Sequence, residues 1–106
     1  MLLLINIKSE REINLMKQAG HLNFLTHEEI KKHLRPGIST KQLDSIAHDF
    51  IIKNGGIPSC LGYEGFPASI CISINDEVVH GIPSNRKIKN GDIVSIDFTV
   101  RLNGYE

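Results

Sequence analysis

Two stretches in the second half of the chain decide the fold. Residues 70–75 read Ile-Cys-Ile-Ser-Ile-Asn, and residues 93–102 read Ile-Val-Ser-Ile-Asp-Phe-Thr-Val-Arg-Leu. Apolar and polar residues alternate in both stretches, which is typical of strands with one buried face. The pairs Asn90-Gly91 and Asn103-Gly104 flank the later stretch and are turn signals. We therefore predict antiparallel strands, with residues 93–102 as one continuous strand. Its apolar face would carry Ile96, Phe98, Val100 and Leu102, and its polar face Ser95, Asp97, Thr99 and Arg101.

The first half of the chain has helical spacing instead. Ser9 followed by Glu12 forms a capping-box pattern, and apolar residues then recur at helical intervals as far as Leu34. Pro36-Gly37 follows and would end this helix.

A second helix is predicted to begin at Ser39 or Thr40, because Gln42 stands three residues after Ser39 and completes another capping box. Gly55-Gly56 supplies a left-handed stop. Two amphipathic helices followed by antiparallel strands place the chain in the α+β class.

Composition indicates an ordinary globular protein. The 106 residues are 41% hydrophobic and 23% charged, and this length allows at most one domain over residues 1–106. Twelve Lys+Arg balance twelve Asp+Glu, so no basic excess favours nucleic-acid binding. The apolar start at residues 1–5 is too short for a membrane span and lacks the basic flank of a signal peptide. We expect a cytoplasmic protein with reduced cysteines.

Asp97 and His80 are the first candidates for chemistry. An acid in the middle of a strand costs desolvation unless it is paired or binds a metal. By spacing alone, a solvent-exposed Asp97 paired with Arg101 or another neighbour is the favoured interpretation. His80 precedes Gly81-Ile-Pro, in a loop position that commonly presents functional side chains, but it could also be a surface histidine in a turn.

The loop at residues 59–67 combines small residues, two aromatic side chains and a thiol. It could line an apolar pocket suited to a thioether, or it could cap the core. The remaining histidines offer less. His21, His27 and His33 recur every six residues and cannot share one helix face. His48 is expected to be solvated.

Taken together, residues 60–83 and 91–97 resemble type I methionine aminopeptidase. The motif Ser-Ile-Asn, then His-Gly-Ile-Pro, then Gly-Asp-Ile-Val and Asp97 is specific, and the turn at residues 35–40 matches the same family. The resemblance covers nearly the whole chain. It implies the amino-terminal half of a pita-bread fold, in which two similar α/β halves surround an antiparallel sheet.

The resemblance also implies a function. A member of this family would remove the initiator methionine from nascent polypeptides, with the ribosome as a place of encounter. It would act as a monomer and would bind neither nucleic acid nor membrane. Asp97 would be the first of five ligands to two divalent ions, which could be cobalt, manganese, iron or zinc. His80 would contact the substrate near the scissile amide. The methionine pocket would be lined by Cys60, Tyr63, Phe66 and Cys71.

The sequence departs from the family pattern in extent. It ends at Glu106, before the family's second aspartate ligand, so this chain alone is expected to be inactive and to expose apolar surface. Phe66 and Glu64 replace residues that bacterial relatives often have as tyrosine and histidine. Two other interpretations are a non-catalytic peptide-binding module and a proline dipeptidase.

Overall fold

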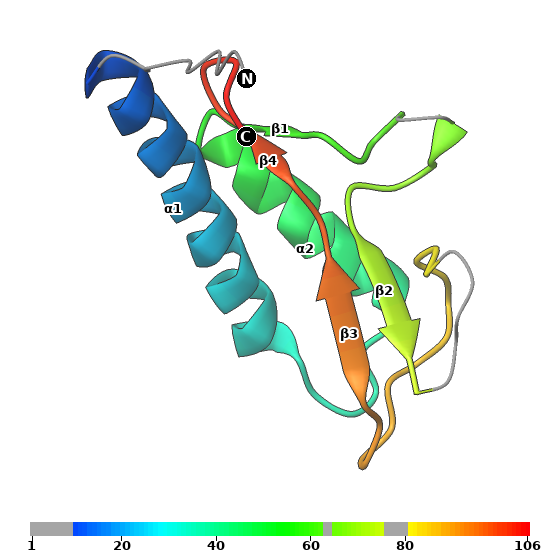
Figure 1. The fold of residues 1–106 in the computed structure, drawn as a ribbon. Helices are drawn as coiled ribbons and strands as arrows, with labels where there is room; N and C mark the ends of the chain where they lie inside the picture. The colour runs from blue at the N-terminus through cyan, green and yellow to red at the C-terminus, as the bar shows by residue number, and fades with distance from the viewer. Residues whose placement is uncertain (1–9, 63–64, 76–80) are drawn as a thin grey trace, which may run out of the picture.

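The computed structural model describes residues 10–62, 65–75 and 81–106. Two helices are followed by four short strands, and both helices lie on one side of the strands (Figure 1). The elements are α1 (Glu10–His33), α2 (Thr40–Lys53), β1 (Ile57–Pro58), β2 (Cys71–Ile74), β3 (Val94–Asp97) and β4 (Val100–Arg101). Within the described ranges, no helix is long and apolar enough to cross a membrane.

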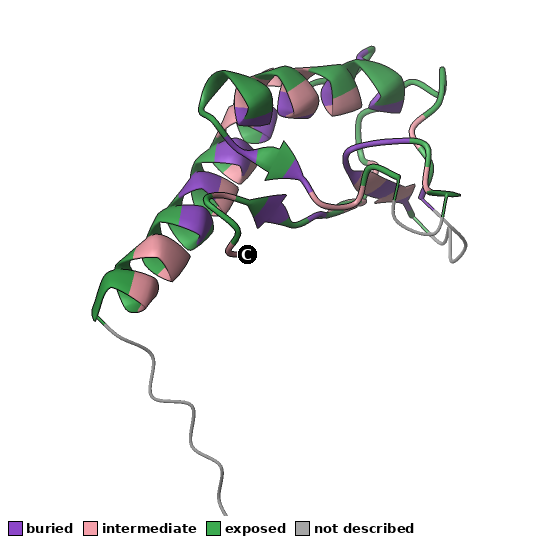
Figure 2. Ribbon diagram, turned by 90° about the horizontal axis from the view of Figure 1, so that it is seen from above, coloured by how far each residue is buried: buried purple, intermediate pink, exposed green. Residues whose placement is uncertain are grey.

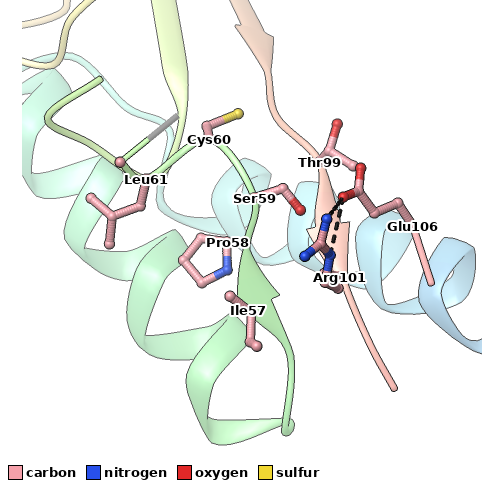
Figure 3. Close-up of a pocket in the computed structure, with 9 residues that line it drawn as sticks. Ile57, Pro58, Ser59, Cys60, Leu61, Thr99, Arg101 and Glu106 are labelled. Atoms are coloured by element: carbon pink, nitrogen blue, oxygen red, sulfur yellow. Dashed lines mark hydrogen bonds and ion pairs between the residues drawn. The ribbon is translucent and has the colours of Figure 1, made fainter. Parts of the chain in front are cut away.

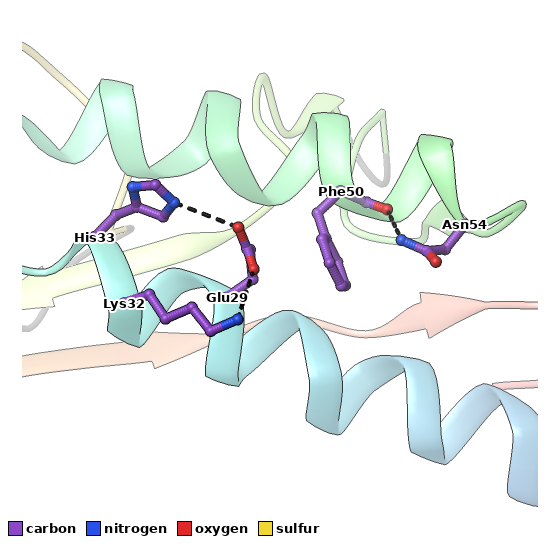
Figure 4. Close-up of polar contacts among 5 residues, drawn as sticks. All are labelled: Glu29, Lys32, His33, Phe50 and Asn54. Atoms are coloured by element: carbon purple, nitrogen blue, oxygen red, sulfur yellow. Dashed lines mark hydrogen bonds and ion pairs between the residues drawn. The ribbon is translucent and has the colours of Figure 1, made fainter.

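Helix α1 packs one narrow stripe against the rest of the molecule. Its buried residues, spaced three or four apart, are Ala19, Leu22, Thr26 and Ile30. The buried Thr26 hydroxyl donates to the Leu22 carbonyl at 2.7 Å, so it carries no unpaired polar group into the core. The last turn is tied together by Glu29, which contacts Lys32 and His33 at 3.5 and 3.3 Å (Figure 4). The helix begins next to Ser9, the predicted cap, which lies outside the described residues.

Helix α2 begins as the sequence predicts. Ser39 is its N-cap: the hydroxyl accepts from the Gln42 N–H at 3.1 Å, and the Gln42 side chain accepts from the Ser39 N–H at 2.9 Å. This reciprocal pair satisfies two amides that the helix itself leaves without partners. At the other end, the backbone and side-chain N–H groups of Asn54 both donate to the Phe50 carbonyl (Figure 4).

The strands form two small antiparallel ladders. In one, β2 pairs with β3 in the register Cys71↔Asp97, Ile72↔Ile96, Ser73↔Ser95 and Ile74↔Val94. In the other, β1 pairs with β4 through Ile57↔Arg101 and Pro58↔Val100.

The prediction of one continuous strand over residues 93–102 is wrong. The ladder stops after Asp97 and resumes at Val100, because the chain changes partner there from β2 to β1. At the break, the Thr99 carbonyl accepts from the Ser59 N–H at 2.9 Å. Ile93 also lies outside the ladder, with its N–H donated to the Asn75 side chain at 3.0 Å.

The alternation of faces survives the break. Ile72, Ile74, Phe98 and Val100 are buried on the face that the helices cover (Figure 2). The opposite face carries the cross-strand pairs of Cys71 with Asp97 and of Ser73 with Ser95, all exposed or half-buried. The polar face predicted from the sequence is therefore the accessible face of β3 and β4.

Candidate active site

Two of the predicted site residues face each other across a ladder. Cys71 is the first residue of β2 and Asp97 the last of β3, and the two are direct antiparallel partners. Side chains of opposed residues in such a ladder lie on the same face, within contact distance of one another. Asp97 is exposed and Cys71 half-buried, so a carboxylate stands beside a thiol at the edge of the accessible face.

The thiol of Cys71 stays protonated at neutral pH. Burial raises its pKa above the ordinary value of 9.0, and the negative charges of Asp97 and then Cys60 raise the pKa further. Each of these influences disfavours the thiolate. Cys60 is close enough to influence the Cys71 thiol electrostatically, and it packs against the same hydrophobic core. The structure therefore brings three predicted residues together: Cys60, Cys71 and Asp97.

Cys60 reaches this position through the segment that follows β1. The preceding Ser59 is bound to the Thr99 carbonyl, two residues beyond Asp97. A pocket of about 660 Å³ opens alongside, lined by residues 57–62 together with Thr99, Arg101 and Glu106 (Figure 3). Arg101 and Glu106 form an ion pair of 2.7 Å at its rim. The sequence left open an ion pair between Asp97 and Arg101. In the structure, Arg101 pairs with Glu106 instead.

Gly81 packs against the other side of Cys71. Its carbonyl accepts from the Ile72 N–H at 2.7 Å. A Cβ atom built on Gly81 would lie 2.5 Å from the Cys71 sulfur and 2.9 Å from the Ile72 carbonyl oxygen. Only a residue without a side chain allows the chain to approach β2 this closely.

The other predicted site residues are Phe66, Tyr63 and His80. Phe66 is half-buried, and its carbonyl accepts from the Gly62 N–H at 2.9 Å, which closes the loop that contains it. Tyr63 and His80 lie outside the described residues, as does Glu64, so their predicted roles stay predictions.

His48 is not solvated as predicted. Its Nδ1 atom hydrogen-bonds the Ser69 hydroxyl at 2.8 Å, and the side chain is half-buried. No role was predicted for Asp44, which lies one turn earlier on α2. Its carboxylate accepts hydrogen bonds from the backbone N–H groups of Ser69 and Ile70, just ahead of Cys71. Both contacts span more than twenty residues of sequence, so no local pattern signals them.

The donor set for a metal is incomplete within the described residues. No group of three or more His, Cys, Asp or Glu side chains there could hold a metal ion. Asp97 offers one exposed carboxylate, whereas cation sites in proteins need several oxygen or nitrogen donors. Asp97 can contribute to a site, but the described part of this chain does not fit a complete one.

The fold is similar to that of solved methionine aminopeptidases. Methionine aminopeptidase from Rickettsia prowazekii superposes with a TM-score of 0.85 at 45% identity, over 92% of this chain and 39% of that one. The enzyme from Thermotoga maritima gives a TM-score of 0.86 at 35% identity, over 95% and 41%. The predicted α+β, pita-bread fold class is confirmed, with two helices followed by antiparallel strands.

The chain belongs to metallopeptidase family M24, whose model matches residues 14–106. It is 58% identical over 102 residues to methionine aminopeptidase 1 of Bacillus subtilis. That alignment covers 96% of this chain and 41% of the relative. The chain thus spans about two-fifths of the length of the relatives it matches. The family is one of metal-dependent peptidases, which confirms the predicted dependence on divalent metal in its general form.

Proposed function

We propose that this chain is the amino-terminal part of a metal-dependent aminopeptidase that removes the initiator methionine from nascent proteins. The observation that carries the proposal is the cross-strand pair of Asp97 and Cys71, with Cys60 nearby. A carboxylate able to bind a cation stands directly opposite one soft thiol, with the second thiol close to the first. The relatives named above, which are methionine aminopeptidases, support the same conclusion.

Asp97 supplies the link to the metal in this proposal. It would be one of five ligands to two divalent ions, and the other four would come from the remainder of the complete protein. Such ions, when bound, lower the pKa of a shared water and polarise the scissile carbonyl. The physiological ions could be cobalt, manganese, iron or zinc, since carboxylate and imidazole ligands accept all four.

The thiols supply the specificity. A protonated Cys71, with Cys60 beside it, forms an apolar and polarizable wall that suits the thioether of methionine. Phe66 and Tyr63 would complete this pocket, and His80 would contact the substrate near the scissile amide. An uncharged wall matters here because a thiolate next to the methionine side chain would have to lose its hydration on binding.

We further propose that the 106-residue chain is inactive by itself, because no group of three or more possible metal ligands comes together among its described residues. The complete protein would act as a monomer in the cytoplasm, on nascent chains that carry methionine before a small residue, and the ribosome would be the place of encounter. Neither nucleic acid nor membrane would be a partner.

The test compares the full-length gene product with this chain on Met-Ala-Ser and Ala-Pro peptides, each assayed with manganese and with a chelator. We expect methionine release by the full-length protein, abolished by the chelator and lowered by about 10³-fold in Asp97→Asn. Ser95→Ala, a change on the same face of β3, is the matched control and should keep activity. Preferential cleavage of Ala-Pro would instead favour a proline dipeptidase. Peptide binding without any cleavage would favour the binding module.

A further inference from the structure

The entry into β2 is fastened to helix α2 by one carboxylate. Asp44 Oδ1 accepts two backbone hydrogen bonds, from the N–H groups of Ser69 and Ile70, each 2.9 Å long. Both donors are almost completely buried: Ser69 is 2% exposed and Ile70 0%. Hydrogen bonds to an ionised acceptor are the stronger kind, and a buried N–H deprived of its acceptor is costly.

A second contact comes from the next turn of the same helix. His48 Nδ1 and the Ser69 hydroxyl are 2.8 Å apart. Residues four apart on a helix lie on one face, so Asp44 and His48 reach the same segment side by side. We call Asp44, His48, Ser69 and the Ile70 amide the α2 clamp. It holds Ser69 by both its backbone and its side chain.

The α2 clamp acts immediately before the candidate active site. Ile70 is followed by Cys71, which begins β2 and opposes Asp97. A strand that slips by one residue turns every side chain to the opposite face. Fixing the two amides ahead of Cys71 therefore fixes which residue of β2 stands beside Asp97. Helix α2 is itself anchored by the core residues Leu43, Ala47 and Ile51.

We propose that Asp44 and His48 are positioning residues of the peptidase site: they touch no substrate, but they set the register that places Cys71 opposite Asp97. The proposal deepens the function proposed above and rests on it for its kinetic readout. Loss of the clamp should loosen the methionine pocket more than it impairs the step that breaks the peptide bond.

The kinetic test uses the full-length protein with manganese and Met-Ala-Ser. We expect Asp44→Ala, which removes both hydrogen bonds to the carboxylate, to raise KM by about tenfold or more, with kcat nearly unchanged. Asp44→Asn keeps an oxygen acceptor at the same place and should restore most of the wild-type KM. Asp49→Ala removes an exposed carboxylate from the same helix, leaves both hydrogen bonds to Asp44 in place, and is the matched control for charge. An unchanged KM in Asp44→Ala, or an equal effect of Asp49→Ala, would overturn the proposal.

A second readout does not depend on peptidase activity. The rate of iodoacetamide alkylation at Cys71, resolved from Cys60 by peptide mass spectrometry, reports how firmly the start of β2 is held. We expect Asp44→Ala to speed alkylation of Cys71 roughly fivefold or more, since a loss of about 1 kcal/mol opens the segment by that factor. Alkylation at the wild-type rate would count against the clamp.

The two readouts separate the two proposals. If the wild-type full-length protein releases no methionine, the proposed function fails, and the alkylation rate still decides the role of the clamp. If Asp44→Ala does not fold, Ser69→Ala removes only the His48 contact and leaves both amides bound to Asp44. That variant should also speed alkylation of Cys71, and no change in its rate would overturn the role assigned to His48.

Discussion

Cys71 and Asp97 are direct partners in the ladder between β2 and β3, one a protonated thiol and the other an exposed carboxylate. Two residues further along, Ser73 and Ser95 form the equivalent pair on the same face with no charge. The sheet therefore contains two matched positions, of which only one has a carboxylate already in place.

This arrangement predicts the effect of a second acid. Cys71→Asp places two carboxylates directly opposite one another and should destabilise the fold at pH 7 by about 0.5–1 kcal/mol. Repulsion favours a proton on one of the two in the folded state, so the lost stability should return as the pH falls towards about 4.5. The measurement is urea unfolding at both pH values. Ser73→Asp, which faces Ser95, is the control, and an equal loss in both variants at pH 7 would contradict this prediction.

Gly81 should tolerate no side chain. The Cβ of Gly81→Ala would approach both the Cys71 sulfur and the Ile72 carbonyl oxygen, at a φ of +42° that strains an alanine. We expect a loss of about 2–3 kcal/mol in urea unfolding, more than for Gly91→Ala. Gly91 has a φ of +92° but no atom within 4 Å of its Cβ position, so it isolates the backbone strain. Equal losses would show that the close contact costs nothing.

Replacing two other glycines with alanine should change the stability of the protein in opposite directions. A Cβ on Gly56 would lie 2.7 Å from Leu22 Cδ2 and 3.0 Å from Val100 Cγ1, where α1, α2 and β4 meet. Gly56→Ala should destabilise the protein by about 1–3 kcal/mol through overpacking. Gly20 lies within α1 with open space around it, so Gly20→Ala should stabilise by about 0.5–1 kcal/mol. Thermal and urea unfolding of both variants measure the change in stability. A change in the same direction in both variants would refute the prediction.

Asp92, in the turn before β3, should make the stability of the fold depend on pH in the acidic range. The Lys89 N–H, which donates to Asp92 at 2.8 Å, holds the pKa of that carboxyl below its ordinary value of 3.8, helped by the Asn75 side chain. A carboxyl with a lowered pKa in the folded state contributes stability above 3.8, and that contribution is lost as the pH falls below it. Urea unfolding from pH 7 to pH 2.5 should therefore show Asp92→Asn less stable than the wild type above about pH 4. The difference in stability between the two proteins should narrow below that pH, and a difference that stays constant would contradict the prediction.

The parts of the fold that could be predicted from the sequence are those with local causes. The start of α2 follows from Ser39 and Gln42, which need only each other to form the capping box. The alternation after Ile93 also placed each side chain on its observed face. The break after Asp97 has no local signal, because it arises when the chain leaves β2 as a partner and joins β1.

The candidate site was predicted residue by residue but not as an arrangement. Asp97 was named as an acid within a strand, and Cys71 through resemblance to a family. Their pairing depends on which strands are neighbours in the sheet. His48 was predicted to be solvated because its partner, Ser69, lies 21 residues away in sequence. Spacing within an element predicts its own faces, and it carries no information about what another element brings to them.

The exchange of partners after Asp97 has a consequence for the order of folding. To pair Pro58 with Val100, the chain must close a loop that contains both β2 and β3. Closing a longer loop costs more chain entropy, and contacts distant in sequence slow folding. The α1–α2 pair can assemble early from neighbouring residues, and the β1–β4 ladder should be the last part to form. Val100→Ala is therefore expected to speed unfolding while leaving the folding rate nearly unchanged.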